Sequence, residues 1–136
     1  MAAFASAAPR GAAADPVNAP QGIAVAGYDV VSYVSEDRAV RGDRQFAVPF
    51  QGVTYLFASA AHRATFIADP TRYLPAYGGY AAYGVANGRM VPADPTIFAV
   101  IDGRIYLNDT REVHSQWLRE PKLFISRANK MWPNVR

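Results

Sequence analysis

Short runs of aromatic and β-branched residues, split by two turn residues, occur twice in the chain. The first two runs, residues 46–50 and 53–57, flank Gln51-Gly52, and the later two flank Asp102-Gly103. A polar residue followed by glycine is the preferred sequence of a two-residue turn between antiparallel strands. The pattern therefore predicts two β-hairpins. The later strands are expected at residues 97–101 and 104–107.

Helices are predicted on both sides of the first hairpin. Ser59 is placed to cap a helix over residues 60–68, and Asp69-Pro70 is expected to end it, because proline disfavours helical backbone in the residue before it. Asp29 is placed to cap a short helix over residues 30–34, which supplies apolar surface to a core.

Two further helices are predicted after the second hairpin. Asp109 is expected to cap the first of them, with Glu112 three residues later completing a capping box. Val113 and Trp117 lie one turn apart and would face the core, and Pro121 suits the first turn of the last helix. The sum is a small single-domain α+β fold with two β-hairpins and several short helices. No internal repeat at a fixed period is expected.

The composition is that of one globular domain. The chain has 136 residues, of which 51% are hydrophobic and 18% charged. No run reaches the ~18 consecutive apolar residues of a membrane-spanning helix. The net charge is +3 and basic residues alternate with acidic ones, so we expect no nucleic-acid partner. The absence of cysteine excludes disulfides, zinc–thiolate sites and a cysteine nucleophile.

Residues 1–21 are rich in alanine and lack a periodic apolar face, so we expect a flexible segment followed by a folded domain over residues 22–136. Ala5-Ser6-Ala7 resembles the small-residue end of a signal peptide, although no basic and no apolar region precedes it. The segment is either the remnant of a truncated signal peptide or a natural flexible N-terminus. The first alternative predicts a periplasmic or secreted protein.

A series of motifs resembles the YHS domain, a small module found alone in exported bacterial proteins and attached to metal-handling proteins. The matching residues are Gly27 to Tyr33, Tyr55-Leu56-Phe57-Ala58-Ser59, His62, Phe66, Asp69-Pro70, Tyr73, Tyr77 to Tyr83, Val100 to Gly103, Leu107-Asn108 and Trp132-Pro133. The resemblance covers about residues 22–133 and is strongest to the stand-alone exported branch. It implies a ligand-binding module, with a metal ion such as copper as the ligand suggested by the family.

The resemblance also marks positions at which relatives carry cysteine. In the metal-associated relatives one cysteine ends the strand and one lies on the first helical turn, where this chain has Ala58 and His62. A further family cysteine corresponds to Ser32, and the cysteine that follows Gly-Gly-Tyr in the exported branch corresponds to Ala81. One soft ligand position is therefore replaced by histidine and the others are lost.

His62 is the main candidate metal ligand. As the third residue of the helix that Ser59 caps, it lies in the positive field of the helix start, which favours the neutral imidazole that ligation requires. Asp29 is the candidate carboxylate ligand, for copper or another transition metal. The alternative is that His62 is a half-exposed helix residue without a ligand. His114, next to Val113, is expected to point away from the core.

Tyrosines supply a second candidate site. Aromatic rings that carry a hydroxyl suit a pocket for a flat or cationic ligand, although core packing is the alternative explanation. We expect the site to lie between His62, the Tyr28-Asp29 turn and residues 77–83. The tyrosines expected to line it are Tyr28, Tyr55, Tyr77, Tyr80 and Tyr83.

Two other classes of function stay open. The chain is alternatively a non-catalytic interaction or structural module, with a protein partner or a second copy, whose family metal site has been lost. The absence of cysteine favours this class, and an exposed patch of tyrosines would support it. An enzyme would require a buried acid or base in an aromatic pocket. The sequence holds no established catalytic motif, so we expect no activity of its own.

Overall fold

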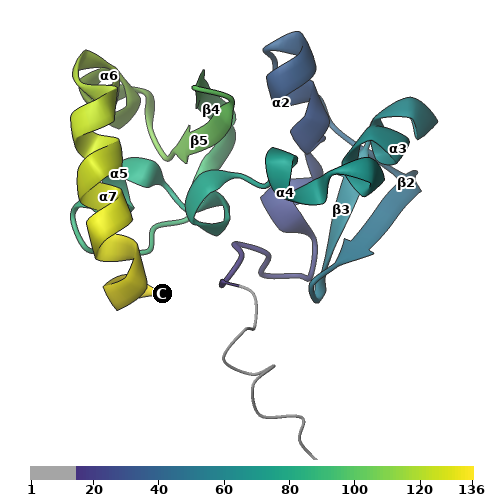
Figure 1. Cartoon of the computed structure of the whole chain (residues 1–136), viewed down its shortest axis with the longest axis horizontal. Helices are drawn as coiled ribbons and strands as arrows, with labels where there is room; N and C mark the ends of the chain where they lie inside the picture. Colours follow the sequence, from purple (N-terminus) through teal and green to yellow (C-terminus); the bar gives the residue numbers. More distant parts are fainter. Residues whose placement is uncertain (1–14) are drawn as a thin grey trace, which may run out of the picture.

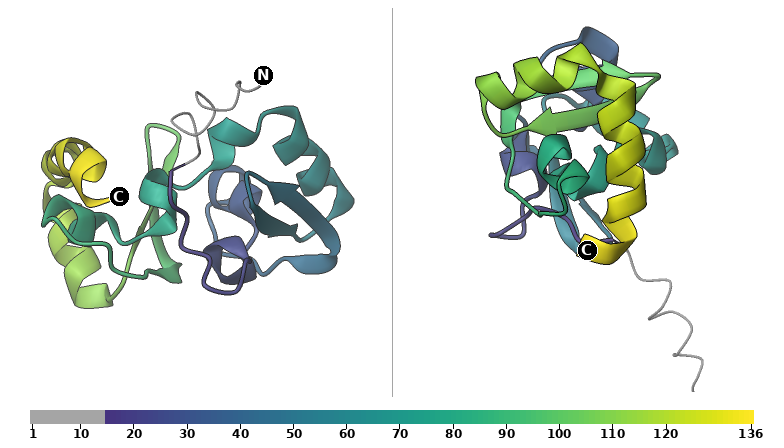
Figure 2. Two further views of the ribbon diagram at one scale, coloured as in Figure 1. Left: turned by 90° about the horizontal axis from the view of Figure 1, so that it is seen from below. Right: turned by 90° about the vertical axis from the view of Figure 1, so that its left-hand side faces the viewer.

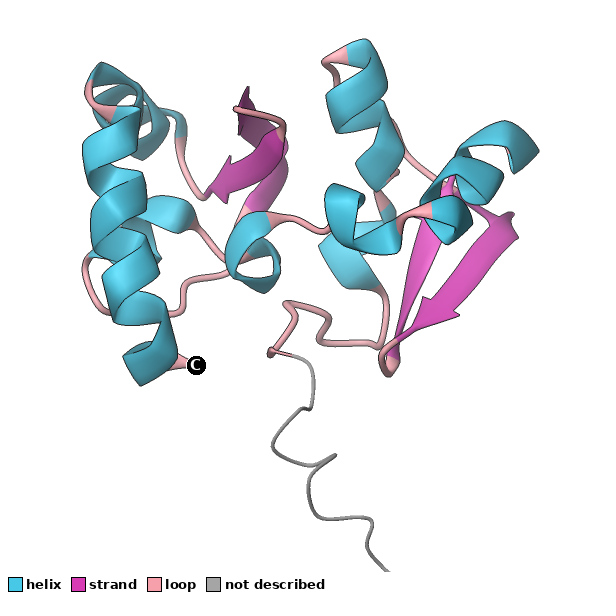
Figure 3. Cartoon of the chain, in the orientation of Figure 1, coloured by secondary structure: helices cyan, strands magenta, loops and turns pink. Residues whose placement is uncertain are grey.

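The computed structural model describes residues 15–136. Within these residues the chain forms a small α+β domain with two two-stranded antiparallel sheets, each a β-hairpin, accompanied by short helices (Figure 1, Figure 3). The predicted fold class is confirmed. The signal-peptide expectation at Ala5-Ser6-Ala7 and most of the expected flexible segment lie outside the described residues.

The chain has two halves with the same order of elements: a 3₁₀ turn, a short helix, a hairpin, a helix, and a helix that begins with proline. The first half contains η1 (Ala24–Gly27), α2 (Val30–Glu36), β2 (Asp43–Phe50), β3 (Val53–Phe57), α3 (Ala60–Ala68) and α4 (Pro70–Tyr73). The second contains η2 (Ala76–Gly79), α5 (Ala82–Ala86), β4 (Asp94–Ile101), β5 (Arg104–Asn108), α6 (Arg111–Arg119) and α7 (Pro121–Val135).

The two hairpins share one register. Asp43 pairs with Phe57 in the first, and Asp94 pairs with Asn108 in the second. In both, the pairing shifts after this point and then continues to the turn. Each aspartate also accepts a hydrogen bond from the backbone N–H two residues later, at 2.8 and 2.9 Å. The likeness therefore extends to irregular details of the strands.

The two 3₁₀ turns have the same unusual backbone. Val25 and Ala26 have φ angles of 55° and 51°, Tyr77 and Gly78 have φ angles of 58° and 63°, and a glycine with positive φ follows each pair. Left-handed backbone is rare for residues with bulky side chains. Its recurrence roughly 50 residues later identifies an internal structural repeat. Our expectation that the chain has no repeat is wrong for the backbone.

Two hydrophobic cores share strand β5. Ile105 and Leu107 belong to the core of the first half, whereas Tyr106 belongs to that of the second. Successive side chains of a strand point to opposite faces, so β5 joins the two halves. Figures 1 and 2 show these halves side by side, with α7 on the outer side of the second half.

The predicted bounds of α3 are confirmed, but one helix was not predicted and one helix cap differs. Asp69-Pro70 ends α3, but Pro70 also begins α4, because the first helical position needs no N–H donor. Helix α6 is capped by Thr110 and not by Asp109. The Thr110 Oγ1 accepts a hydrogen bond from Val113 N at 3.2 Å.

Residues 15–18, which we expected to belong to the flexible segment, lie against the second half and are called the strap below. Asn18 N donates a hydrogen bond to Gly78 O at 2.9 Å. The Asp15 carboxylate accepts a hydrogen bond from the indole Nε1 of Trp132 at 3.0 Å. The strap therefore touches both the 3₁₀ turn η2 and the last helix.

Gly78→Ala is expected to lower the free energy of unfolding by about 1–3 kcal/mol, measured in urea. A Cβ at Gly78 would overlap the Pro16 carbonyl oxygen and lie 3.1 Å from Val17 Cα, so the strap would have to move. The backbone angles alone do not forbid alanine, because Ala26 holds the equivalent position in the first half.

Gly22→Ala is the matched control for this variant. Gly22 also has a positive φ, 81°, but nothing lies within 4 Å of its added Cβ, so this variant measures backbone strain alone. Protease cleavage within the strap is expected to increase only in Gly78→Ala. Equal losses of stability in both variants would show that the strap contact contributes nothing.

Candidate functional site

A fully buried carboxylate, Asp29, holds the corner where α2, the end of β3 and the start of α3 meet. Its Oδ1 accepts hydrogen bonds from Val31 N and Ser32 N at 2.8 and 3.1 Å, which confirms its predicted role as the cap of α2. Its Oδ2 accepts a bond from Ala58 N at 2.8 Å and lies 2.8 Å from His62 Nδ1. The carboxylate accepts every one of these bonds, so the His62 Nδ1 carries the proton it shares with Asp29.

His62 reaches this corner through the cap of α3. Ser59 Oγ accepts a hydrogen bond from His62 N at 3.1 Å, as the sequence predicts. Because Nδ1–H is donated to Asp29, the Nε2 of a neutral ring presents a lone pair on its other side. The group beside Nε2 is the Glu36 carboxylate, whose Oε2 is 3.4 Å away. The His62 side chain is 19% exposed, so Nε2 is within reach of solvent ions.

Ser32 does not complete a nucleophilic triad with this pair. Its Oγ lies 3.4 Å from His62 Nδ1, the nitrogen that already donates to Asp29. In a Ser–His–Asp triad the serine bonds to the opposite ring nitrogen. The corner therefore offers an oriented imidazole without an activated hydroxyl.

Three of the positions that the resemblance to the YHS domain marked as cysteine positions meet at this corner. Ser32 N, Ala58 N and His62 Nδ1 each hydrogen-bond to the carboxylate of Asp29. Ala81 lies elsewhere: it is the N-cap residue of α5 in the second half, where it is fully buried. The structure thus brings together His62, Asp29, Ser32 and Ala58, but not Ala81.

In the second half the start of α5 meets the end of β5 in an equivalent corner, whose buried acceptor is uncharged. Ala81 takes the place of Asp29 and makes no side-chain cap. Asn108, fully buried at the end of β5, supplies the missing acceptor, and its Oδ1 accepts a bond from Tyr83 N at 2.9 Å. Its Nδ2 lies 3.0 Å from His114 Nδ1. A neutral amide therefore accepts one N–H at this helix start, whereas Asp29 accepts two at the equivalent start in the first half.

The two corners differ in the charge of their buried acceptor, which is a carboxylate in the first half and an amide in the second. Both corners need a buried acceptor for a helix N–H, but the Asn108 corner shows that the acceptor need not be charged. Burying a carboxylate costs several kcal/mol before its partners compensate. The Asp29 charge is compensated by three backbone N–H donors and by the His62 ring, whereas Asn108 accepts a bond from one backbone N–H.

His114 does not point away from the core, as we expected, and this expectation is wrong. Its ring stacks on Trp117 with centroids 5.9 Å apart, and Asn108 holds its Nδ1. Burial lowers the pKa of His114, and the charge of Arg111 lowers it further, while a hydrogen bond with the backbone of Phe98 raises it. His114 is accordingly a neutral packing residue at pH 7.

The structure does not bring the predicted tyrosines together around His62. Tyr77 belongs to the second core, with Tyr80 and Tyr83 packed against it. The side-chain partners of His62 all come from the first half. The hollow expected between His62 and residues 77–83 is therefore not formed.

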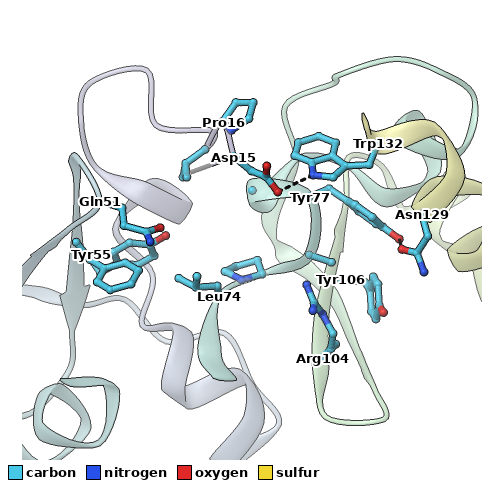
Figure 4. Close-up of a pocket in the computed structure, with 15 residues that line it drawn as sticks. Asp15, Pro16, Gln51, Tyr55, Leu74, Tyr77, Arg104, Tyr106, Asn129 and Trp132 are labelled. Atoms are coloured by element: carbon cyan, nitrogen blue, oxygen red, sulfur yellow. Dashed lines mark hydrogen bonds between the residues drawn. The ribbon is translucent and has the colours of Figure 1, made fainter. Parts of the chain in front are cut away.

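A cavity of about 340 Å³ lies between the two halves instead (Figure 4). Tyr55 and Tyr77 line it, together with Arg104 and Trp132, which the sequence did not indicate. Burial raises the pKa of Tyr55 to about 12, so its hydroxyl stays protonated at pH 7. Tyr28 lies away from this cavity, 5.2 Å from the guanidinium carbon of Arg41, which sits over its ring.

Glu36 was also missed in the sequence. The helix expected over residues 30–34 continues to Glu36, one turn beyond Ser32 and therefore on the same face. Ser32 and Glu36 lie four residues apart on this helix, and this spacing could have indicated that Glu36 lies near His62. Within residues 15–136, no group of three or more His, Cys, Asp or Glu side chains is placed to hold a metal ion.

No family model, no curated protein and no solved structure matches this chain. The corner around His62 and the cavity between the halves are therefore the features that bear on its function. None of the helices in the described part of the chain is both long and apolar enough to cross a membrane.

Proposed function

We propose that this protein is an exported, YHS-type ligand-binding module that binds Cu(II) through His62 and Glu36. One observation carries the proposal: Nε2 of His62 faces Oε2 of Glu36 at 3.4 Å. In the neutral tautomer fixed by Asp29, both atoms are acceptors. Two such acceptors repel each other unless a proton, a bridging water or a metal cation lies between them.

Asp29 has a different role in this proposal from the ligand role expected for it. Its oxygens already accept bonds from three backbone N–H groups and from the His62 ring. A carboxylate that accepts the Nδ1–H of a ligating histidine fixes the orientation of the ring and raises the basicity of Nε2. Asp29 is therefore the residue that orients the ligand.

The donor set favours a borderline metal over a soft one. Imidazole nitrogen and carboxylate oxygen suit Cu(II), whereas Cu(I) prefers thiolate and thioether sulfur. The chain has no cysteine to supply the thiolate. With two protein donors, water would complete the coordination, so the site fits weak and exchangeable binding of Cu(II).

Cu(II) titration followed by calorimetry and electron paramagnetic resonance tests the proposal. His62→Ala is expected to weaken Cu(II) binding by at least about tenfold and to remove the nitrogen hyperfine splitting of the bound ion. Glu36→Gln is expected to weaken binding less, because the imidazole is retained.

Glu112→Gln provides the matched control. Glu112 is an exposed glutamate in the first turn of α6, so Glu112→Gln removes one negative charge, as Glu36→Gln does, without touching the corner. Its Cu(II) affinity should equal that of the unchanged protein. If His62→Ala and the unchanged protein gave equal heats and spectra, the proposed Cu(II) site at His62 would be contradicted.

The interaction-module alternative has less support. It anticipated an exposed tyrosine patch, but Tyr77 is 7% exposed and packs between Tyr106 and Trp132. The enzyme alternative needs a buried acid or base in the aromatic cavity. The one carboxylate among the described lining residues is Asp15, which is half exposed and already bound by Trp132.

A further inference from the structure

The cavity between the two halves has a lining drawn from both repeats and from the strap (Figure 4). Gln51 and Tyr55 come from the first hairpin, Arg104 from the second, and Trp132 from α7. None of the residues around Asp29 and His62 takes part, so this cavity is separate from the proposed metal centre. Its volume of about 340 Å³ suits a small organic ligand.

The walls of the cavity are aromatic. Tyr55, Tyr77, Tyr106 and Trp132 all contribute to it. The Tyr77 hydroxyl is already engaged, because it donates a hydrogen bond to Asn129 Oδ1 at 2.8 Å. What this part of the cavity presents is therefore mainly ring surface, which favours a flat ligand.

The charge at the cavity comes from Arg104. This residue begins β5, its side chain is exposed, and no acidic group forms an ion pair with it anywhere in residues 15–136. Its positive field reaches the aromatic wall. It lowers the pKa values of Tyr77 and Tyr106, although burial, the larger effect, raises both.

The negative charge at the opposite edge is balanced within the protein. Asp15 accepts a hydrogen bond from Trp132 Nε1 at 3.0 Å and forms an ion pair with Arg136. Arg104 is thus the cation at this cavity that lacks a counterion in the described residues. This balance disfavours the cationic ligand that tyrosines alone suggested.

We infer that the cavity between the halves binds a small planar carboxylate, with the aromatic walls holding its ring and Arg104 its carboxylate group. A guanidinium matches a carboxylate with two parallel hydrogen bonds, which gives such a ligand both affinity and orientation. Gln51 and Asn129 add amide groups at the same cavity for polar substituents.

Calorimetric titration with two acids and their uncharged analogues tests this inference. The probes are benzoate and indole-3-acetate, with benzamide and indole-3-acetamide as analogues of the same shape. Each acid is expected to bind at least about tenfold more tightly than its amide. Arg104→Gln is expected to abolish this preference while leaving the unfolding transition unchanged, because the side chain is exposed.

Arg119→Gln is the control, since Arg119 is an exposed arginine on α6 that does not line the cavity. Its preference for the acids should match that of the unchanged protein. The inference is overturned if neither acid binds at millimolar concentration, if acid and amide bind equally, or if Arg104→Gln keeps the preference. Repeating the titration with His62→Ala should change nothing, so this result stands apart from the outcome at the metal centre.

Discussion

Asp29→Ala is expected to lower the free energy of unfolding by about 3–5 kcal/mol, the largest effect of any polar substitution in the chain. The variant removes the acceptor of three backbone N–H groups, those of Val31, Ser32 and Ala58, and the partner of the His62 ring. All four donors meet at a carboxylate that is fully buried. Urea unfolding followed by tryptophan fluorescence measures the loss.

Asp43→Ala is the control for this substitution. Asp43 also accepts a backbone hydrogen bond, from Gln45 N at 2.8 Å, but it is exposed and water can replace it. Its removal is expected to cost at most about 1 kcal/mol. If the two alanine variants lost the same stability, water would have to reach the corner around Asp29. The predicted dependence of the loss on the burial of Asp29 would then be wrong.

Gly42→Ala is expected to be the most damaging change of a glycine, with a loss of about 3 kcal/mol or more. An added Cβ would overlap the carbonyl carbon of Leu56 and lie 2.5 Å from its oxygen. These are backbone atoms of β3, so no side chain can turn aside to make room. Urea unfolding measures this loss, and the far-ultraviolet circular dichroism of the folded state shows whether the first hairpin still forms.

Gly52→Ala separates steric overlap from backbone strain. Gly52 lies in the turn of the same hairpin with a φ of 86°, but nothing lies within 4 Å of its added Cβ. The expected loss is about 1 kcal/mol, from the left-handed backbone alone. Gly42 does not have a positive φ, so a loss there as small as at Gly52 would mean that β2 and β3 separate easily.

The features that the sequence predicted correctly are local ones. Turn sequences placed both hairpins, and Ser59 and Asp29 were recognised as caps because each bonds within three residues of itself. Thr110 was missed in favour of its neighbour Asp109, since both are good cap residues one position apart. Which of the two residues caps α6 depends on where β5 ends.

The repeat leaves only short traces in the sequence, which we missed: Gly-x-x-Tyr-Leu occurs at residues 52–56 and 103–107, and Gly-Tyr at residues 27–28 and 79–80. Elsewhere different residues produce the same backbone. Asp29 and Ala81 hold equivalent cap positions, and the acceptor that Ala81 lacks comes from Asn108 in a neighbouring strand. A comparison of residue types along the chain cannot detect an exchange between two elements. The order of the elements, the register of the hairpins and the positive φ angles show the repeat directly.

The candidate site was predicted in part. His62 and Asp29 do meet, and both lie at element ends that the sequence identified. The cavity was not predicted, because Arg104 and Trp132 reach it from elements that only tertiary packing brings near Tyr55. Two of the predicted tyrosines, Tyr55 and Tyr77, do line it, but the residues that line it with them lie far away in the sequence.

The second of the two like units has the backbone of the corner around Asp29 and His62 without its imidazole–carboxylate pair. Val113 stands in the second unit where His62 stands in the first, each at the residue whose N–H the helix cap accepts. Ala81 stands in the same way for Asp29. Histidine at position 113 and aspartate at position 81 would therefore meet a main chain that already has the required conformation. The groups in their way would be the Asn108 amide and the His114 ring bonded to it.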